Sequence, residues 1–268
     1  MIARLLGTVL VAALLGGCAG SSDTGTTAAG RMSSTSPSPS SPSSSSSPTP
    51  APSRAVDANG FPVPTRPDCA ADVAGDFVVA TTSEGNAGGM LILGTGTRGI
   101  VLGPQSDGDI CQWLPYAQEL ATHFRVALFD WEEPREEVPL LAVQQLRKAG
   151  ATKVVLAGAS LGGAFALSEA YRVRPRLAGV MTFGGELTLP FFDGRPGIRK
   201  WRGPLLQISS VDDDYFTSRN ARELRVLHPG PETILMLPGS THGVAMLDGP
   251  DGQRVRATVD RFLARVLG

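Results

Sequence analysis

The sequence contains few of several residue types that carry function in other proteins. Three of its 268 residues are histidine, three are cysteine and three are lysine, so 21 of the 24 basic residues are arginine. The formal net charge is −1, and the chain therefore has no overall field that favours nucleic acid or an anionic membrane surface. We attribute the excess of arginine to a G+C-rich genome rather than to a function.

The N-terminal apolar run is too short to cross a bilayer as a stable helix. It extends from Leu5 to Leu15 after a single basic residue, Arg4, and has the proportions of a secretory signal. The run ends in the sequence LGGC at 15–18, which resembles the lipobox of bacterial lipoproteins. The resemblance implies that residues 1–17 are removed, that the Cys18 thiol is acylated, and that the protein is held on the extracytoplasmic face of the cell membrane. An ordinary signal peptide with an incidental cysteine is the alternative.

Residues 18–56 contain almost nothing that could form a core. From residue 33 to residue 52 nearly every residue is Ser or Pro, and no large apolar group is present. Such a segment cannot offset its ordering entropy, so we expect a disordered, fairly extended tether. Residues 57–268, about 210 residues, are enough for one domain with a sizeable core.

The small number of cysteines limits the possible disulfides. If Cys18 is acylated, only Cys69 and Cys111 remain. Outside the cytoplasm two remaining cysteines favour one disulfide, which typically contributes about 2–4 kcal/mol. Two unpaired buried thiols are the alternative.

The pattern of apolar residues in 57–268 alternates between strands and helices. Strand-like runs occupy 77–82, 88–94, 99–103, 125–130, 153–158, 177–184, 204–210 and 233–239. Helical spacing occurs in 112–123, 136–151, 161–173, 218–227 and 252–267. Glycine-rich turns between the first three strands favour antiparallel pairing near one sheet edge. The alternation predicts an α/β fold with a mostly parallel eight-stranded sheet, helices on both faces, and a ligand site at the carboxyl ends of the strands.

One serine lies where such a site is expected. Ser160 follows the strand at 153–158 directly and precedes the helix at 161–173, with Gly158 and Gly162 two residues to either side. Small residues are needed there because strand and helix crowd each other at a tight turn that exposes the serine hydroxyl. The Leu161 N–H then lies at a helix N-terminus, where it can stabilise an oxyanion. A helix-capping serine without chemistry is the alternative.

The stretch AGATKVVLAGASLGG at 149–163 resembles the nucleophile elbow of the α/β-hydrolase family, and the resemblance extends over residues 75–268. The family places an acid after a later strand and a histidine after the last strand, in the order Ser, Asp, His. His242 follows the last predicted strand, whereas His123 and His228 stand where neither is expected to reach the site. The resemblance implies that His242 accepts the Ser160 proton and returns it to the leaving group.

Three adjacent acids follow the strand at 204–210. The family's usual spacing favours Asp213 as the acid that orients His242, with Asp212 and Asp214 as turn or capping residues. A solvated turn is one alternative, and a calcium site is another that lacks further ligands at loop spacing.

The loop after the third strand departs from the family. The family often has His-Gly followed by the residue whose N–H completes the oxyanion hole, whereas this chain has Gly103-Pro104-Gln105. The resemblance assigns that N–H to Gln105. A slip of one residue would place Pro104 there, and proline has no N–H to donate.

The segment 185–203 is too short to form a large lid, so we expect an open site like that of small esterases and dienelactone-hydrolase-like proteins. Its aromatic residues Phe191, Phe192 and Trp201 could line an acyl pocket, and Arg195, Arg199 and Arg202 could favour an anionic substrate. We favour the simpler interpretation, in which the aromatic residues pack the loop onto the domain and the arginines are solvated.

The sequence therefore predicts a lipid-anchored, extracytoplasmic serine hydrolase of small carboxylic esters or thioesters. We expect no metal, no organic cofactor and no nucleic-acid partner, and we assume a monomer. A peptidase or amidase with the same three residues remains open, as does a surface binding protein of this fold that has lost turnover. The replaced His-Gly pair supports the latter.

Overall fold

The structure, a computed structural model, describes residues 55–268. The expected signal peptide, Cys18 and all but the last two residues of the expected tether lie outside the described residues. No helix within residues 55–268 is long and apolar enough to cross a membrane. Near the start of the described part, Val56 forms an isolated antiparallel bridge with Pro62.

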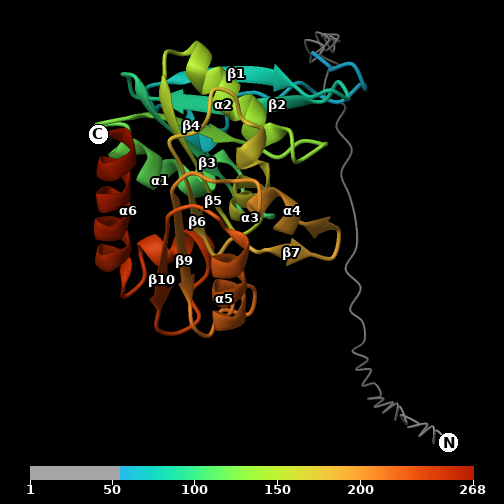
Figure 1. Ribbon diagram of the computed structural model, residues 1–268. Helices are drawn as coiled ribbons and strands as arrows, with labels where there is room; N and C mark the ends of the chain where they lie inside the picture. The colour runs from blue at the N-terminus through green and yellow to red at the C-terminus, as the bar shows by residue number, and fades with distance from the viewer. Residues whose placement is uncertain (1–54) are drawn as a thin grey trace, which may run out of the picture. The chain divides into compact units, whose positions relative to one another are not determined.

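An eight-stranded sheet forms the centre of the molecule (Figure 1), and its strand order is β1-β2-β4-β3-β5-β6-β9-β10. The strands are β1 (Asp76–Thr81), β2 (Ala87–Leu93), β3 (Arg98–Gly103), β4 (Arg125–Phe129), β5 (Lys153–Ala159), β6 (Gly179–Phe183), β9 (Leu205–Ser210) and β10 (Glu232–Leu237). Only β2 runs opposite to the other strands, so the pairs β1–β2 and β2–β4 are antiparallel and all other pairs are parallel. This is the predicted mostly parallel sheet with an antiparallel edge.

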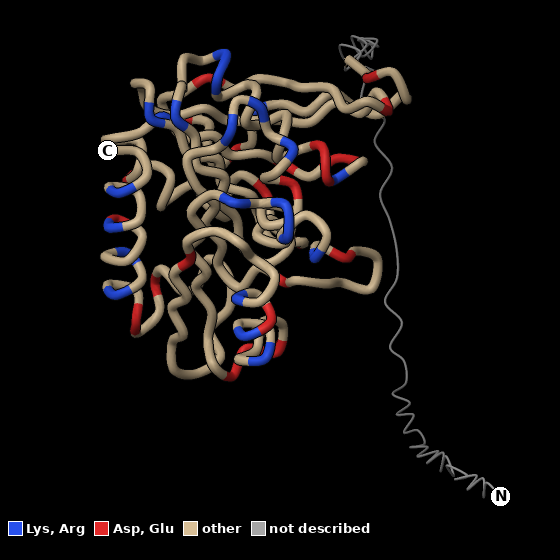
Figure 2. The backbone as a smooth tube through the Cα atoms, in the orientation of Figure 1, with Lys and Arg blue, Asp and Glu red and all other residues tan. Residues whose placement is uncertain are grey.

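Helices cover both faces of this sheet. Helices α1 (Ile110–Leu120) and α6 (Gly252–Leu267) share one buried apolar cluster with one face. Helices α2 (Val138–Lys148), α3 (Leu161–Glu169) and α5 (Ser218–Leu227) contribute to a second cluster on the other face. Lys, Arg, Asp and Glu are concentrated on the helices and connecting loops (Figure 2), as expected for a sheet covered on both sides.

The central strands read as continuous apolar runs because both of their faces are buried. In β5, Val155 packs in the cluster with α1 and α6, whereas Val154 and Leu156 pack in the cluster with α2 and α3. Consecutive side chains of a strand point to opposite faces, so each cluster takes every second residue. This arrangement fixes the carboxyl ends of β3, β5, β6 and β9 at one edge, where the candidate site lies.

The predicted antiparallel pairing of the second and third strands is wrong. Strand β4 lies between them, because β2 pairs antiparallel with β4 while β3 pairs parallel with both β4 and β5. The four residues between β2 and β3 must cross about two strand spacings, roughly 10 Å, which a short extended segment can span. Gly94 begins this crossing at φ 67°, where a Cβ would lie 2.3 Å from the carbonyl oxygen of Phe124, just before β4.

The segment 185–203 forms only small elements. They are the two-stranded hairpin of β7 (Thr188–Leu189) and β8 (Phe192–Asp193), followed by the single-turn helix α4 (Arg195–Ile198). Trp201 is 2% exposed and packs in the cluster with α2 and α3, so it does not line a substrate pocket. For Trp201 the loop-packing interpretation therefore holds.

The expected disulfide between Cys69 and Cys111 is present, with the two Cα atoms 5.9 Å apart. Cys69 lies in the short 3-10 helix η1 (Asp68–Ala70), and Cys111 is the second residue of α1. The Asp109 side chain accepts a hydrogen bond from the Cys111 N–H at 2.8 Å and so caps the start of α1. The disulfide therefore holds the first turn of α1, which borders the loop that follows β3.

Candidate active site

Ser160 lies on a strained turn between β5 and α3. Its backbone has φ 48° and ψ −115°, and no other non-glycine residue of 55–268 has a positive φ. The Ser160 side chain makes no capping bond to α3, which removes the usual structural reason for a serine at this position. Strain of this kind persists only where the surrounding structure holds it.

The two flanking glycines leave no room for a larger residue. A Cβ on Gly158 would lie 2.3 Å from the carbonyl carbon of Gly162, and a Cβ on Gly162 would lie 2.4 Å from the carbonyl oxygen of Gly103. The Ser160 N–H donates to the Phe183 carbonyl of β6 at 2.9 Å and anchors the turn to the neighbouring strand. The crowding expected from the sequence thus arises from the contact of the turn with α3 and with the end of β3.

Asp213 and His242 meet although they are 29 residues apart. Asp213 follows β9, is 2% exposed, and holds its Oδ2 2.8 Å from Nδ1 of His242, which follows β10. The other oxygen, Oδ1, accepts the N–H of Tyr215 at 2.8 Å and that of Phe216 at 3.4 Å. A carboxylate only accepts, so Nδ1 carries the proton and Nε2 is left as an acceptor.

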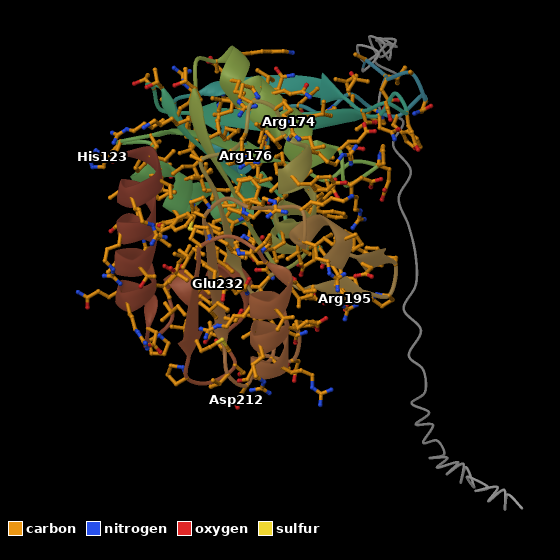
Figure 3. All side chains as sticks on the ribbon, in the orientation of Figure 1. His123, Arg174, Arg176, Arg195, Asp212 and Glu232 are labelled. Atoms are coloured by element: carbon orange, nitrogen blue, oxygen red, sulfur yellow. A yellow bond between two sulfur atoms is a disulfide. The ribbon has the colours of Figure 1, made fainter. Side chains whose placement is uncertain are left out.

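Asp212 and Asp214 are exposed and take no part in this contact. Of the other histidines, His228 is buried and its Nε2 lies 3.1 Å from the Gly203 carbonyl oxygen; burial lowers the pKa of this imidazole. His123 lies at the periphery of the molecule (Figure 3). The structure therefore brings only His242 of the three histidines to Ser160.

A cavity of about 330 Å³ lies above Ser160 and joins it to His242. The Nε2 atom of His242 is buried and has no hydrogen-bond partner within residues 55–268. The residues that line the cavity come from loops at the carboxyl ends of the strands: Gln105, Ser106, Asp107, Ser160, Leu161, Glu186, Leu189, Phe191, Tyr215 and His242. A serine and an unpartnered imidazole nitrogen that border one cavity are the groups that proton transfer from the hydroxyl needs.

In the loop after β3, Gln105 makes hydrogen bonds that the sequence did not predict. The Gln105 N–H donates to Oε1 of Gln112 at 2.9 Å, and the Gln105 carbonyl accepts the indole N–H of Trp131 at 2.7 Å. The side-chain Oε1 of Gln105 accepts the Val244 N–H at 3.2 Å. The N–H that the family resemblance assigns to the oxyanion is thus already bonded within the protein.

The Leu161 N–H differs from that of Gln105. It has no hydrogen-bond acceptor within the described part of the chain. The Pro104 carbonyl accepts the Gly162 N–H at 3.1 Å, so Pro104 serves this region as an acceptor. Of the two predicted donors, Leu161 alone is free as the structure stands.

Comparison with known proteins gives no match at the level of sequence families. No protein-family model matches the chain, and no curated protein matches it. Solved structures do match. An esterase from Pyrococcus furiosus superposes with a TM-score of 0.62 at 10% identity, covering 77% of this chain and 97% of its own. A thermophilic esterase from Thermogutta terrifontis superposes with a TM-score of 0.58 at 16% identity, covering 71% and 99%.

An enol-lactonase from Burkholderia xenovorans is similar over 70% of this chain and all of its own, with a TM-score of 0.56 and 17% identity. The chain has the α/β-hydrolase fold. Identities this low establish the arrangement of strands and helices and nothing finer. In this chain the three residues brought together at the cavity occur in the order Ser160, Asp213, His242.

Glu186 is a residue of the site that the sequence interpretation missed. It follows β6 by three residues, is half-buried and lines the cavity above Ser160. The pKa of Glu186 is raised to about 7: burial is the main cause, His242 opposes the rise, and the negative charge of Asp213 adds to it. Its place at the carboxyl end of a central parallel strand is a signal that could have indicated it.

Within residues 55–268 no group of three or more His, Cys, Asp or Glu residues is arranged to hold a metal ion. The calcium interpretation of Asp212, Asp213 and Asp214 is therefore not supported, since Asp213 is committed to His242. Arg195 is paired with Glu223 at 2.6 Å and with Asp193 at 3.5 Å, and it does not line the cavity above Ser160.

Proposed function

We propose that the protein is a serine hydrolase of carboxylic esters or thioesters. The observation that carries the proposal is the cavity that Ser160, on its strained turn, shares with His242, whose Nε2 has no partner within residues 55–268. The Asp213 contact with Nδ1 supports the tautomer that this chemistry needs. The similarity to two esterases and an enol-lactonase supports the same reaction class.

In the proposed reaction, Oγ of Ser160 attacks the carbonyl carbon of the ester while its proton passes to Nε2 of His242. The tetrahedral intermediate collapses, the bond to the alcohol or thiol breaks, and His242 delivers the proton to that leaving group. Water, deprotonated by Nε2, then attacks the acyl-enzyme; the bond to Oγ breaks, His242 returns the proton to Oγ, and the acid and free Ser160 are released. Asp213 keeps the ring oriented and stabilises the imidazolium in both halves of the reaction.

Stabilisation of the oxyanion rests on Leu161 in this proposal. Its N–H lies next to the nucleophile, at the start of α3, where the helix dipole also favours negative charge. Gln105 becomes the second donor when Oε1 of Gln112 releases its N–H. Loss of a single such donor commonly lowers kcat by about 10²- to 10³-fold, so the state of this one hydrogen bond matters for the rate.

The occupied Gln105 N–H also favours the alternative function, a binding protein of this fold without turnover. The two functions differ in one measurement, the reaction of the full-length protein with a fluorophosphonate probe. We expect labelling of Ser160 that disappears in Ser160→Ala and persists in Ser240→Ala, which alters an exposed serine two residues before His242. A wild-type protein that remains unlabelled would contradict the proposal. A peptidase or amidase would also be labelled, and parallel ester and amide substrates distinguish it.

We further propose that the protein is a monomer anchored by an acyl chain on Cys18 at the extracytoplasmic face of the membrane. The Cys69–Cys111 disulfide supports an oxidising compartment. Replacement of Cys18 by alanine should release the protein from the membrane fraction. Unchanged fractionation of Cys18→Ala would contradict the anchor.

A further inference from the structure

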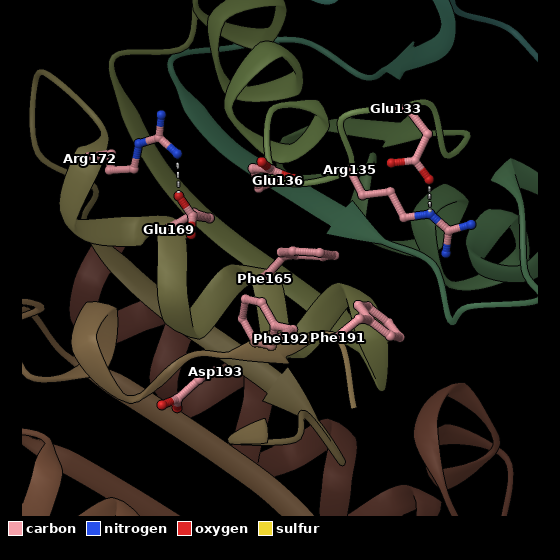
Figure 4. A pocket seen from close by; sticks show the side chains of 9 residues that line it. All are labelled: Glu133, Arg135, Glu136, Phe165, Glu169, Arg172, Phe191, Phe192 and Asp193. Carbon is pink, nitrogen blue, oxygen red and sulfur yellow. Dashed lines mark hydrogen bonds and ion pairs between the residues drawn. The ribbon is translucent and has the colours of Figure 1, made fainter. Parts of the chain in front are cut away.

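The cavity above Ser160 adjoins a larger one. Phe191, at the tip of the β7–β8 hairpin, lines both, and the second cavity has a volume of about 630 Å³ (Figure 4). Its lining residues come from the loop between β4 and α2, from α3 with the turn after it, and from the hairpin: Glu133, Arg135, Glu136, Phe165, Glu169, Arg172, Phe191, Phe192 and Asp193. An ester bound at Ser160 can therefore extend past Phe191 into a second space.

Negative charge predominates along this path. The cavity above Ser160 is lined by the carboxylates of Asp107 and Glu186, and neither Lys nor Arg is among its lining residues. The larger cavity holds four carboxylates against the guanidinium groups of Arg135 and Arg172.

Both of these guanidinium groups are already paired. Arg135 lies 2.9 Å from Glu133, and Arg172 lies 2.7 Å from Glu169. Of the remaining carboxylates, Asp193 accepts the Arg195 backbone N–H at 3.1 Å and has a long ion pair of 3.5 Å with the same residue, whereas Glu136 has no ion pair within residues 55–268. The lining therefore carries carboxylate charge that the protein does not neutralise.

Aromatic rings form the apolar part of the same surface. Phe165 and Phe192 meet edge to face with their centroids 5.0 Å apart, and Figure 4 shows Phe191 beside them. Phe191 is 70% exposed, so its ring is accessible to a ligand. Ring faces next to uncompensated carboxylates are suited to organic cations, which bind to both.

We propose that the two cavities that meet at Phe191 bind an ester whose non-reacting part carries an alkylammonium or guanidinium group. The inference rests on the proposed ester hydrolysis and adds the class of substrate. It replaces the anionic substrate considered from the sequence, because Arg195, Arg199 and Arg202 line neither cavity.

Glu186 adds a pH dependence to this preference. The charged groups that face it across its cavity are Asp107 from the loop after β3, Asp213 after β9 and His242 after β10. Because the pKa of Glu186 is about 7, its carboxyl is largely neutral at pH 6 and largely ionised at pH 8. A substrate cation gains attraction as the carboxylate forms, so preference for the cationic ester should rise across this range.

The test compares matched esters on the full-length protein. One series consists of p-nitrophenyl esters of short and long alkanoic acids that end in trimethylammonium, each paired with its neutral carbon isostere ending in tert-butyl. A second pair carries the charge on the alcohol: a choline ester and the ester of the neutral carbon isostere of choline. We expect kcat/KM to favour the cationic member of at least one series by about 3- to 10-fold at low ionic strength, and less at high salt.

Variants locate the cation. The quantity compared is the ratio of kcat/KM for the cationic ester to kcat/KM for its neutral isostere. Glu186→Gln should lower this ratio for short substrates and remove its rise with pH, whereas Glu136→Gln should lower it for long substrates. Phe191→Leu keeps the apolar area and removes the ring, so it should also lower the ratio. Glu84→Gln removes one charge from the exposed β1–β2 turn, outside both cavities, and should leave the ratio unchanged. The neutral ester, measured on each preparation, corrects for the amount of folded enzyme.

The outcomes separate the two proposals. If no ester of either kind is hydrolysed, the proposed function fails. If all pairs are hydrolysed with equal kcat/KM at low salt, hydrolysis stands and the cation inference is wrong. A preference that survives in Glu186→Gln, Glu136→Gln and Phe191→Leu would also overturn it, because the cation would then bind elsewhere.

Discussion

The two walls of the cavity above Ser160 differ in how many of their polar groups are already bonded. On the wall formed after β5 and β10, the Leu161 N–H and Nε2 of His242 have no partner within residues 55–268. On the wall formed after β3, the N–H, the carbonyl and the side-chain oxygen of Gln105 are all engaged. We call the first the open wall, because these two groups are unpaired, and the second the bonded wall, because the protein itself satisfies its polar groups.

The largest expected effect concerns the open wall. Asp213→Asn removes the acceptor that fixes the proton of His242 on Nδ1, and we expect kcat for a p-nitrophenyl ester to fall by about 10³-fold or more. Asp212→Asn is the matched control, because this neighbouring carboxylate is exposed and has no contact with the ring. Equal losses in the two variants would show that Asp213 is not the orienting acid.

The second prediction concerns the point where the two walls meet. In Gly162→Ala the new Cβ would lie 2.4 Å from the Gly103 oxygen and 2.6 Å from the Pro104 oxygen, so the two loops must separate. We expect the free energy of unfolding in urea to fall by about 1–3 kcal/mol, together with a loss of activity. Gly88→Ala should lower the free energy of unfolding less, because the atom nearest to its new Cβ would be Cγ of the flexible Glu132 side chain, at 3.2 Å. Full stability of Gly162→Ala would refute the crowding argument.

The third prediction alters the bonded wall. Gln112→Met removes the acceptor that occupies the Gln105 N–H, and a neutral hydrogen bond of this kind contributes about 1 kcal/mol. Freeing the N–H for the oxyanion should therefore raise kcat/KM by about 5- to 10-fold. Gln118→Met, on the exposed face of the same helix, should have no effect. A decrease in Gln112→Met would mean that Gln112 positions the loop rather than competing with the substrate.

The smallest expected effect is on stability. Glu186 has a pKa of about 7 in the folded protein against 4.5 for an ordinary glutamate, so the folded state binds more protons between these values. Its contribution to stability is present below pH 4.5 and is lost as the pH rises through 7. Because the residue is half-exposed, we expect only about 1 kcal/mol across this window.

Urea unfolding of wild type and Glu186→Gln at pH 5 and pH 8 measures this contribution as a difference between the two proteins. The comparison is needed because His228 contributes a pH dependence of the opposite sign. Burial lowers the pKa of His228 in the folded protein below its ordinary value of 6.5, so this residue makes the free energy of unfolding rise with pH between those two values. Parallel pH dependences in the two proteins would show that Glu186 titrates normally.

The contrast between the walls also explains what the sequence could predict. The strands were identified within about two residues because a run buried on both faces is apolar throughout. The turn at Ser160 was identified because its requirements are local: a strand, a helix and two glycines in contact. The order of strands β2, β4 and β3 was missed, since a four-residue connection can either form a hairpin or cross a neighbouring strand.

The bonded wall depends on contacts that no local pattern records. Gln112 reaches Gln105 from the start of α1, and Trp131 reaches it from the end of β4. Many glutamines have the same neighbours in sequence and make no such bond, so only the three-dimensional arrangement shows it. Glu186 lies between these two cases. Its position after β6 can be read from the sequence, whereas its burial, which raises its pKa, is seen only in the structure.

The disulfide has a mechanical consequence. It joins residues 42 positions apart and encloses β1, β2 and β3 in a covalent ring. Tension entering the domain from its N-terminal side passes at Cys69 through the sulfur atoms to Cys111 and into α1. The backbone of the three enclosed strands and of the Gln105 loop lies off that covalent path while the bond is intact. Residues before Cys69 reach it only through non-covalent contacts, such as the hydrogen bond from the Ala87 N–H to Asp57 Oδ2. A pull on the proposed tether would therefore reach the bonded wall of the site through non-covalent contacts rather than along the backbone.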